Sequence, residues 1–193
     1  MANPTHVAKL KEGLAAWNAW REGNPGIRVD LRGADLQDLV IDGNDRMGAD
    51  LIQADLSGAN LQRARLRGAV LIGARLEGAD LRRANLTDAR LVRADLTRAD
   101  LSLASLRDAD LREADLTGAD LTCANLFQGN LGNANLTHAH LRSTVLMNAS
   151  LTGAKLGATT LADLDLSVAN GLSSITHLLP SDIGCATLWS WQK

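Results

Sequence analysis

Leucine recurs at every fifth position through most of this chain. Stepping by five from Leu31 to Leu166 gives 28 positions, and 26 of them are leucine. Two residues before the central leucine, from Ala49 to Ala154, 20 of 22 positions are alanine. The residue directly before the leucine is mostly Asp or Asn. The departures are Ile41 and Arg46 at the leucine position, and Gly129 and Thr144 at the alanine position.

A period of five residues fits neither the 3.6-residue period of an α-helix nor the alternation of a β-strand. A chain that turns a corner every five residues keeps each Leu, and the Ala two positions before it, on the inside. Four corners return the chain above its starting point, so successive coils can pair as strands about 4.8 Å apart. The pattern predicts an all-β solenoid over residues 30–170, with about seven coils and a length of roughly 34 Å.

The repeated Ala-(Asp/Asn)-Leu-X-X unit, as in ADL at 34–36 and ANL at 59–61, resembles the pentapeptide-repeat family. This resemblance covers residues 30–170 and implies a right-handed quadrilateral β-helix. We expect the short Asp and Asn side chains to accept hydrogen bonds from the backbone at the corners. They are therefore interpreted as turn residues before any catalytic or ligand-binding role is considered.

Both ends of a stacked rod expose unpaired backbone and apolar interior, so we expect caps. Residues 5–22 are predicted to form one amphipathic helix within an N-terminal helical cap at residues 1–29. The apolar positions recur at steps of three or four, Thr5 is the expected N-cap, and residues 23–25 stop the helix. The apolar stripe consists of Val7, Leu10, Leu14 and Trp17.

Residues 171–193 are predicted to be a C-terminal cap or a short, partly helical tail. Ser173 to Leu179 could form a helix that ends before Pro180. Trp189 and Trp191 either help to close the rod or pair with a second copy of the chain. This tail resembles a segment that follows the repeats in some larger bacterial members of the family.

The first coil is irregular, because Arg46 stands where an inward Leu belongs and Asn44 where Ala belongs. Burying an unpaired guanidinium among leucines is prohibitively costly, so the backbone is expected to bulge outward there. A cation-binding loop built from Asp42, Asn44 and Asp45 is the alternative. The spacing of these residues fits no established calcium loop.

The length, net charge and cysteine content of the chain argue against several classes of function. The chain has 193 residues, which suits one domain, with a formal charge of −2 and a pI near 6.1. Neither value is typical of a dedicated nucleic-acid or anionic-membrane binder. Two cysteines without a CxxC motif do not indicate a disulfide framework or a zinc site. We expect a cytoplasmic protein that neither enters a membrane nor binds nucleic acid directly.

The family resemblance also implies a possible mimic of duplex DNA that acts on DNA gyrase, as in members that confer quinolone resistance. Residues 30–170 contain 19 acidic and 15 basic residues, an excess of four acids. B-DNA of the same length carries about 20 negative charges, so mimicry by the whole rod is disfavoured. One acidic patch remains a candidate; it consists of Asp95, Asp100, Asp110, Asp115 and Asp120.

Two sets of outward apolar residues are candidate protein-binding surfaces. Ile52, Ile72 and Val92 lie 20 residues apart, one coil after another, and Phe127 and Met147 form a similar pair. Contiguous exposed apolar surface often marks a protein contact. The alternative is that these side chains only stabilise the ladder between coils.

No catalytic residue, cofactor-binding residue or metal ligand is predicted. His138 and His140 flank a corner with Asp120 one coil away, but two surface histidines are more often only solvated. The column of Asp80, Asp100 and Asp120 could raise one carboxyl pKa or attract a cation, although Arg82 and Arg83 nearby should compensate. The sequence predicts a noncatalytic scaffold for an unknown protein partner, with a homodimer through an end or an apolar stripe possible. The alternative is a gyrase-interacting DNA mimic.

Overall fold

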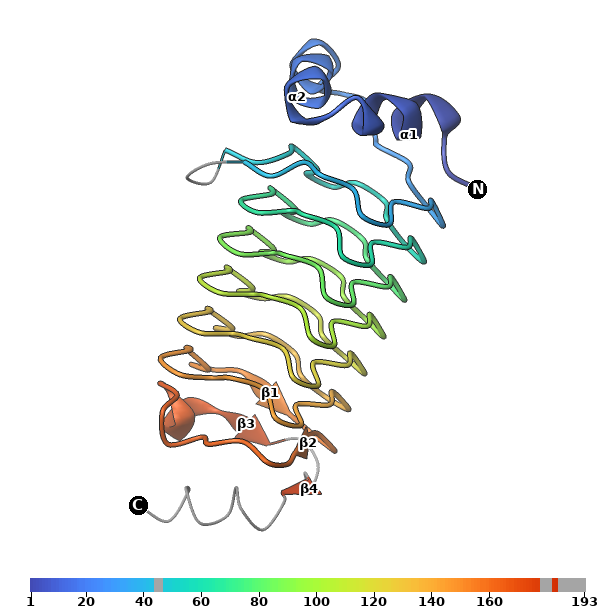
Figure 1. Cartoon of the computed structure of the whole chain (residues 1–193). Helices are drawn as coiled ribbons and strands as arrows, with labels where there is room; N and C mark the ends of the chain where they lie inside the picture. Colours follow the sequence, from blue (N-terminus) through green and yellow to red (C-terminus); the bar gives the residue numbers. More distant parts are fainter. Residues whose placement is uncertain (44–46, 178–181, 184–193) are drawn as a thin grey trace.

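The computed structural model describes residues 1–43, 47–177 and 182–183, and it shows a rod of stacked coils (Figure 1). Two helices lie across the N-terminal end of the rod, and the chain then winds toward the other end. Within these residues, no helix combines the length and the apolar character needed to cross a bilayer.

Successive coils are joined by parallel bridges at the residue that precedes each central leucine. In the regular part of the rod the bridged residues are 20 positions apart, as in Asp80 with Asp100 and Asp100 with Asp120. Four columns of bridges run along the rod, and they start at Asp30, Asp35, Val40 and Asp50. The five-residue period therefore sets the four sides of the coil.

Every backbone N–H of a pentad with Asp or Asn before its leucine has an acceptor, which explains why so short a repeat can form a stable wall. The N–H of the central Leu and the N–H two residues later donate to one neighbouring coil, and the N–H before Leu donates to the other. The Ala N–H donates to the carbonyl of the preceding Leu and so closes the corner. The N–H of the residue directly after Leu donates to the Asp or Asn side chain. In one pentad these donors are Leu81, Arg83, Asn85, Ala84 and Arg82, in that order.

The expected role of Asp and Asn at the corners is confirmed by these bonds. Asp115 Oδ1 accepts the N–H of Thr117 at 3.0 Å, and Asn125 Oδ1 accepts that of Phe127 at 3.0 Å. The third residue of each corner has a positive φ, for example 61° at Gly78 and 59° at Arg83. Asx side chains and left-handed residues together make the sharp bend.

The interior holds leucine and alanine. The central leucines from Leu51 to Leu166 are at most 2% exposed, and the alanines from Ala49 to Ala154 are at most 1% exposed. The leucines lie along the axis, while the small alanines let the wall close around them. An axis of this width has no room for aromatic rings, which accounts for their scarcity in the repeat.

The first coil is longer than the others. Asp30 bridges Asp55, 25 residues away, whereas Asp50 bridges Val70 at the regular 20. The five additional residues fall in the first coil, where the N–H groups of Gly43 and Gly48 donate to the carbonyls of Arg67 and Gly68, two neighbouring residues of the next coil. A Cβ on Gly43 would collide with Gly48, so this close approach requires glycine. The register agrees with the predicted outward bulge, while Asn44, Asp45 and Arg46 lie outside the described residues.

The N-terminal segment contains two helices, so the prediction of one helix at residues 5–22 was wrong. Helix α1 spans Pro4–Lys11 and α2 spans Leu14–Gly23. The break occurs at Gly13, whose φ of 102° is outside the helical region. The predicted N-cap was also wrong: Asn3 caps α1, and its side chain accepts the N–H of Thr5 at 2.9 Å.

The two helices supply hydrogen-bond partners to the first coil, which has no coil above it. His6 Nδ1 accepts the Asp30 N–H at 3.0 Å, and Asn18 Oδ1 accepts the Asp50 N–H at 3.0 Å. The Trp17 indole donates to the Asp50 carbonyl at 2.8 Å, and Trp17 is fully buried. The contacts satisfy backbone groups that a regular coil would pair with its neighbour.

The C-terminal segment follows the path of the coils farther than its sequence indicates. A 3₁₀ helix, η1, spans Leu172–Ser174. Strand β1 (Lys155–Leu156) then pairs in parallel with β3 (Thr176–His177), and β2 (Thr160–Leu161) pairs with β4 (Asp182–Ile183). The predicted helix from Ser173 was wrong because Thr176 and His177 are extended, and backbone pairing does not require the Leu-Ala code.

Candidate functional site

Ile52, Ile72 and Val92 lie on one side of the rod on three successive coils, as the register predicted. The Gln53 N–H donates to the Ile72 carbonyl at 3.0 Å, and the Gly73 N–H donates to the Val92 carbonyl at 2.9 Å. Ile52 is 40% exposed, while Ile72 and Val92 are half-buried. We call these three residues the Ile72 stripe.

The Ile72 stripe extends to the helical end of the rod through a residue that sequence reasoning missed. Ile27, 42% exposed, lines a hollow of about 160 Å³ together with Ile52 and the buried Arg21. At the other end, Arg112 follows Val92 one coil later and ends the apolar surface. Ile27 precedes the repeat, so the five-residue register gave no signal for it.

Phe127 and Met147 also lie one coil apart, with the Gln128 N–H donating to the Met147 carbonyl at 3.0 Å. Their exposure differs. The Arg107 guanidinium carbon lies 4.5 Å from the centroid of the Phe127 ring, so a cation covers one face of this half-buried ring. Met147 is 48% exposed. Met147 is therefore more exposed to a partner than Phe127 is.

Met147 belongs to a hollow of about 290 Å³ that sequence reasoning did not find. Val145, 45% exposed, and Leu164 also line it. Leu164 stands at a position where the repeat has alanine, and the regular bridge of Val145 to the following coil is missing from the described residues. Leu164 is buried, so the exposed apolar surface of this hollow belongs mainly to Val145 and Met147.

The acidic patch is a real cluster in space. Asp95 bridges Asp115, Asp100 bridges Asp120, and Asp110 begins the coil that contains Asp115 and Asp120. Each of the five carboxylates also accepts a backbone N–H at its own corner. These aspartates are therefore turn residues that also present negative charge.

Two of the five carboxylates are near arginines. Asp110 lies 2.6 Å from the Arg112 guanidinium, and hydrogen bonds from that side chain hold the Asp110 pKa below its usual range. Asp100 lies 3.6 Å from Arg82. Among the described residues, no Lys or Arg nitrogen lies within 4.0 Å of the carboxylates of Asp95, Asp115 and Asp120. The negative charge of the patch is therefore concentrated on these three.

The stacked column of Asp80, Asp100 and Asp120 does not raise the pKa of Asp80. Hydrogen bonds from the Arg82 side chain, 2.7 Å away at its closest, hold the Asp80 pKa below its usual value. The predicted compensation by Arg82 is therefore present. His140 lies next to Thr160 in the same column, with Nδ1 3.2 Å from the hydroxyl. The described part of the chain has no group of three metal-ligating side chains.

Trp189 and Trp191, the last of the predicted interaction residues, lie outside the described residues. The other predicted residues form three separate outward surfaces: the Ile72 stripe, the Phe127–Met147 pair and the acidic patch.

Comparisons with known proteins identify the type of repeat. A family model described as pentapeptide repeats matches residues 49–88, 89–128 and 124–167, with eight copies. Among solved structures, HetL from the cyanobacterium Nostoc, a pentapeptide repeat protein involved in heterocyst differentiation regulation, is 26% identical. The match covers 85% of this chain and 92% of HetL, with a TM-score of 0.38. The comparison with curated proteins found no match.

Two further solved structures are similar to this chain. A pentapeptide repeat protein of the Arabidopsis thaliana thylakoid lumen is 34% identical over 58% of this chain and 71% of that chain, with a TM-score of 0.33. QnrB1, a plasmid-mediated fluoroquinolone resistance protein, is 19% identical over 69% of this chain and 77% of that chain, with a TM-score of 0.38.

The family match spans more than half of the chain and coincides with the stretch in which the bridges recur every 20 residues. The rod is therefore a right-handed β-helix, and the chain belongs to the pentapeptide-repeat family.

Proposed function

We propose that this protein is a noncatalytic β-helical scaffold that binds a protein partner through the Ile72 stripe. The observation that carries the proposal is the outward stacking of Ile52, Ile72 and Val92 on one flat side, continued by Ile27. Contiguous apolar surface of this kind favours a protein contact over solvent. Pentapeptide repeat proteins are generally noncatalytic scaffolds, which supports the same reading.

The surroundings of the Ile72 stripe suit a contact centre with a polar rim. Gly73, beside Ile72, has no side chain to hold a partner away. Arg93 pairs with Glu113 at 2.7 Å at one margin, and Gln53 lies at another. A standard interface buries about 800 Å² per partner, so three aliphatic side chains supply the apolar core and polar neighbours supply the rest.

The experiment compares Ile72→Asp with Thr152→Asp. Thr152 occupies the corresponding outward position on the same side of the rod, four coils from Ile72, and it is exposed. Tagged wild-type protein and both variants are used to capture partners from an extract of the source cell. Sedimentation velocity on the purified proteins measures self-association.

We expect Ile72→Asp to lose a partner, or a self-association, that wild type and Thr152→Asp both keep. Far-UV circular dichroism confirms that both variants are folded. If Ile72→Asp retains the same partners and the same sedimentation coefficient as wild type, the stripe is only part of the ladder between coils.

A second candidate is a DNA-mimicking protein that interacts with gyrase through the acidic patch. It is favoured by the concentration of charge on Asp95, Asp115 and Asp120, which lack an arginine or lysine within 4.0 Å among the described residues. The decisive assay is gyrase supercoiling with and without a quinolone. Changing all three to Asn keeps a corner acceptor, as Asn125 and Asn135 show, while removing the charge. A wild-type effect that the triple variant loses would support mimicry, and no effect at micromolar protein would exclude it.

A further inference from the structure

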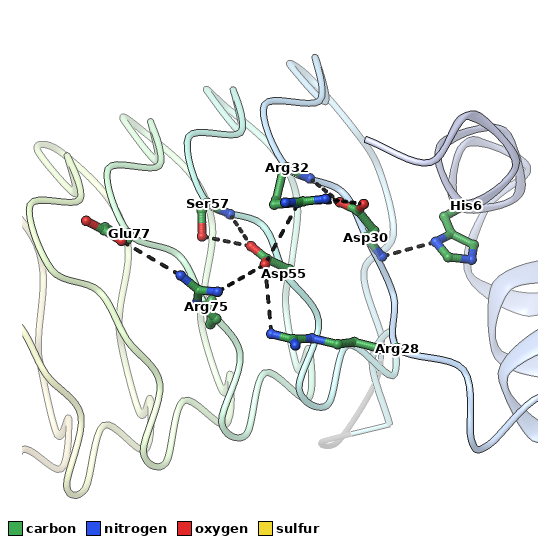
Figure 2. A network of polar contacts seen from close by, with 8 residues as sticks. All are labelled: His6, Arg28, Asp30, Arg32, Asp55, Ser57, Arg75 and Glu77. Carbon is green, nitrogen blue, oxygen red and sulfur yellow. Dashed lines mark hydrogen bonds and ion pairs between the residues drawn. The ribbon is translucent and has the colours of Figure 1, made fainter. Parts of the chain in front are cut away.

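A hollow of about 360 Å³ lies beside the first coils of the rod, on a different side from the Ile72 stripe. Its lining combines three arginines with two aspartates, and Figure 2 shows how these side chains converge. The lining residues are Arg28, Val29, Asp30, Arg32, Asp55 and Arg75. Arg28 follows α2, whereas Arg32 and Arg75 belong to separate coils.

Asp55 lies within 4.0 Å of all three arginines. It is only 6% exposed, and its Oδ1 accepts the N–H and the hydroxyl of Ser57 at 3.2 and 2.8 Å. Its Oδ2 faces Arg75 at 3.4 Å, Arg28 at 3.9 Å and Arg32 at 4.0 Å (Figure 2). These distances exceed the roughly 2.7–2.9 Å of a strong charge-assisted hydrogen bond. One buried carboxylate therefore holds three guanidinium groups near one another without using up their donors.

Most of the guanidinium donors around the hollow have no protein acceptor. Each arginine carries five N–H groups. Within the described residues, Arg32 donates two side-chain hydrogen bonds to Asp30 at 2.9 and 2.8 Å, and Arg75 donates one to Asp55 at 3.4 Å. No side-chain hydrogen bond is found for Arg28, which has only the 3.9 Å ion pair.

The charge of the hollow favours an anion. Three guanidinium groups face two lining carboxylates, one of which is already held bidentately by Arg32. Glu77 lies outside the lining and reaches Arg75 only at 3.9 Å. Arg32 and Asp30 offset each other, so Arg28 and Arg75 together face the single carboxylate of Asp55. The lining therefore carries one more positive than negative charge.

We propose that this hollow binds a phosphate group, as inorganic phosphate or as a phosphate monoester. The planar guanidinium fork matches two phosphate oxygens at once, and a dianion suits the converging arginines. The volume lies within the roughly 300–1,000 Å³ of small-molecule sites and leaves room for an ester substituent. A bound phosphate would join the linker after α2 to the coils that carry Arg32 and Arg75.

The test uses the intact chain with sodium phosphate, O-phosphoserine, or sodium chloride at equal ionic strength. Ligand that binds only the folded state raises the melting temperature in a saturable way. Isothermal titration calorimetry gives the dissociation constant. We expect both phosphate compounds, and not chloride, to raise the melting temperature. Tighter binding of O-phosphoserine would identify a monoester as the ligand, and equal binding would identify free phosphate.

Arg28→Gln should weaken phosphate binding by roughly tenfold or more, because it removes a charged donor group. It should not unfold the protein, since the Arg28 side chain is 66% exposed. Arg98→Gln is the matched control: Arg98 is exposed, and Gln53 already occupies the equivalent corner position in another pentad. An equal stabilisation by chloride, or equal binding by wild type and Arg28→Gln, would overturn the proposal.

Discussion

Replacing Leu101 with Ala should destabilise the rod by about 3–5 kcal/mol. Leu101 is fully buried on the axis. The substitution removes three carbon atoms, which accounts for about 2.4 kcal/mol of lost burial. Backbone hydrogen bonds keep the wall from moving in to fill the space. The Leu101 N–H donates to the Asp120 carbonyl at 2.7 Å, and the Ala104 N–H donates to the Leu101 carbonyl at 3.0 Å. The residual cavity therefore places the loss in the upper part of the range for such changes.

The chain contains a matched control two residues away. Leu103 is 51% exposed, and its φ of 61° directs it outward at a corner. Leu103→Ala should change the unfolding free energy by less than about 0.5 kcal/mol. Urea unfolding followed by far-UV circular dichroism measures both variants. Equal losses for the two, or a loss below about 1.5 kcal/mol for Leu101→Ala, would mean that the axis collapses around the deletion.

Two other predictions concern charge and the helical end. The Asp110 pKa is lowered by Arg112, so this pair stabilises the fold above the unfolded-state pKa of about 3.9, and the contribution is lost as pH falls through the lower folded-state pKa. The melting temperature of Arg112→Gln should thus lie below that of wild type at pH 6 and approach it as pH falls below about 4; a constant difference would contradict this. Trp17→Phe removes the donor to the Asp50 carbonyl and should cost about 1–3 kcal/mol, with faster hydrogen exchange in the first coil. Unchanged exchange there would show that the indole bond does not hold the helices to the rod.

Sequence reasoning failed at the N-terminal helices for a local reason. The apolar spacing of Leu10, Leu14 and Trp17 is equally compatible with one helix or with two that share a buried face. The choice depends on Gly13, which is tolerated inside a helix but here has a positive φ. The break allows both Leu10 and Trp17 to become fully buried. Tertiary packing, which the local pattern does not contain, decided between the two arrangements.

The candidate surfaces were predictable to the extent that they lie within the repeat. Ile52, Ile72 and Val92 are 20 residues apart, and an unbroken register places them on one side. Ile27 lies before the repeat, so its position beside Ile52 depends on how the helices pack on the first coil. Val145 was missed because it stands directly before a central leucine, where Asp or Asn is usual, and the pattern gave no sign that it borders a hollow with Met147.

The sequence by itself determined the coil: which residues point inward, where the corners fall and which Asx side chains close them. It could do so because every pentad meets similar neighbours one coil away, so a local pattern repeats as a tertiary one. Only the tertiary structure decided which first-coil residues lie beside which residues of the next coil. The first step along this column is 25 residues long, and it places Asp30 beside Asp55. A regular step of 20 would have placed it beside Asp50, and the three arginines would not have converged on one buried carboxylate.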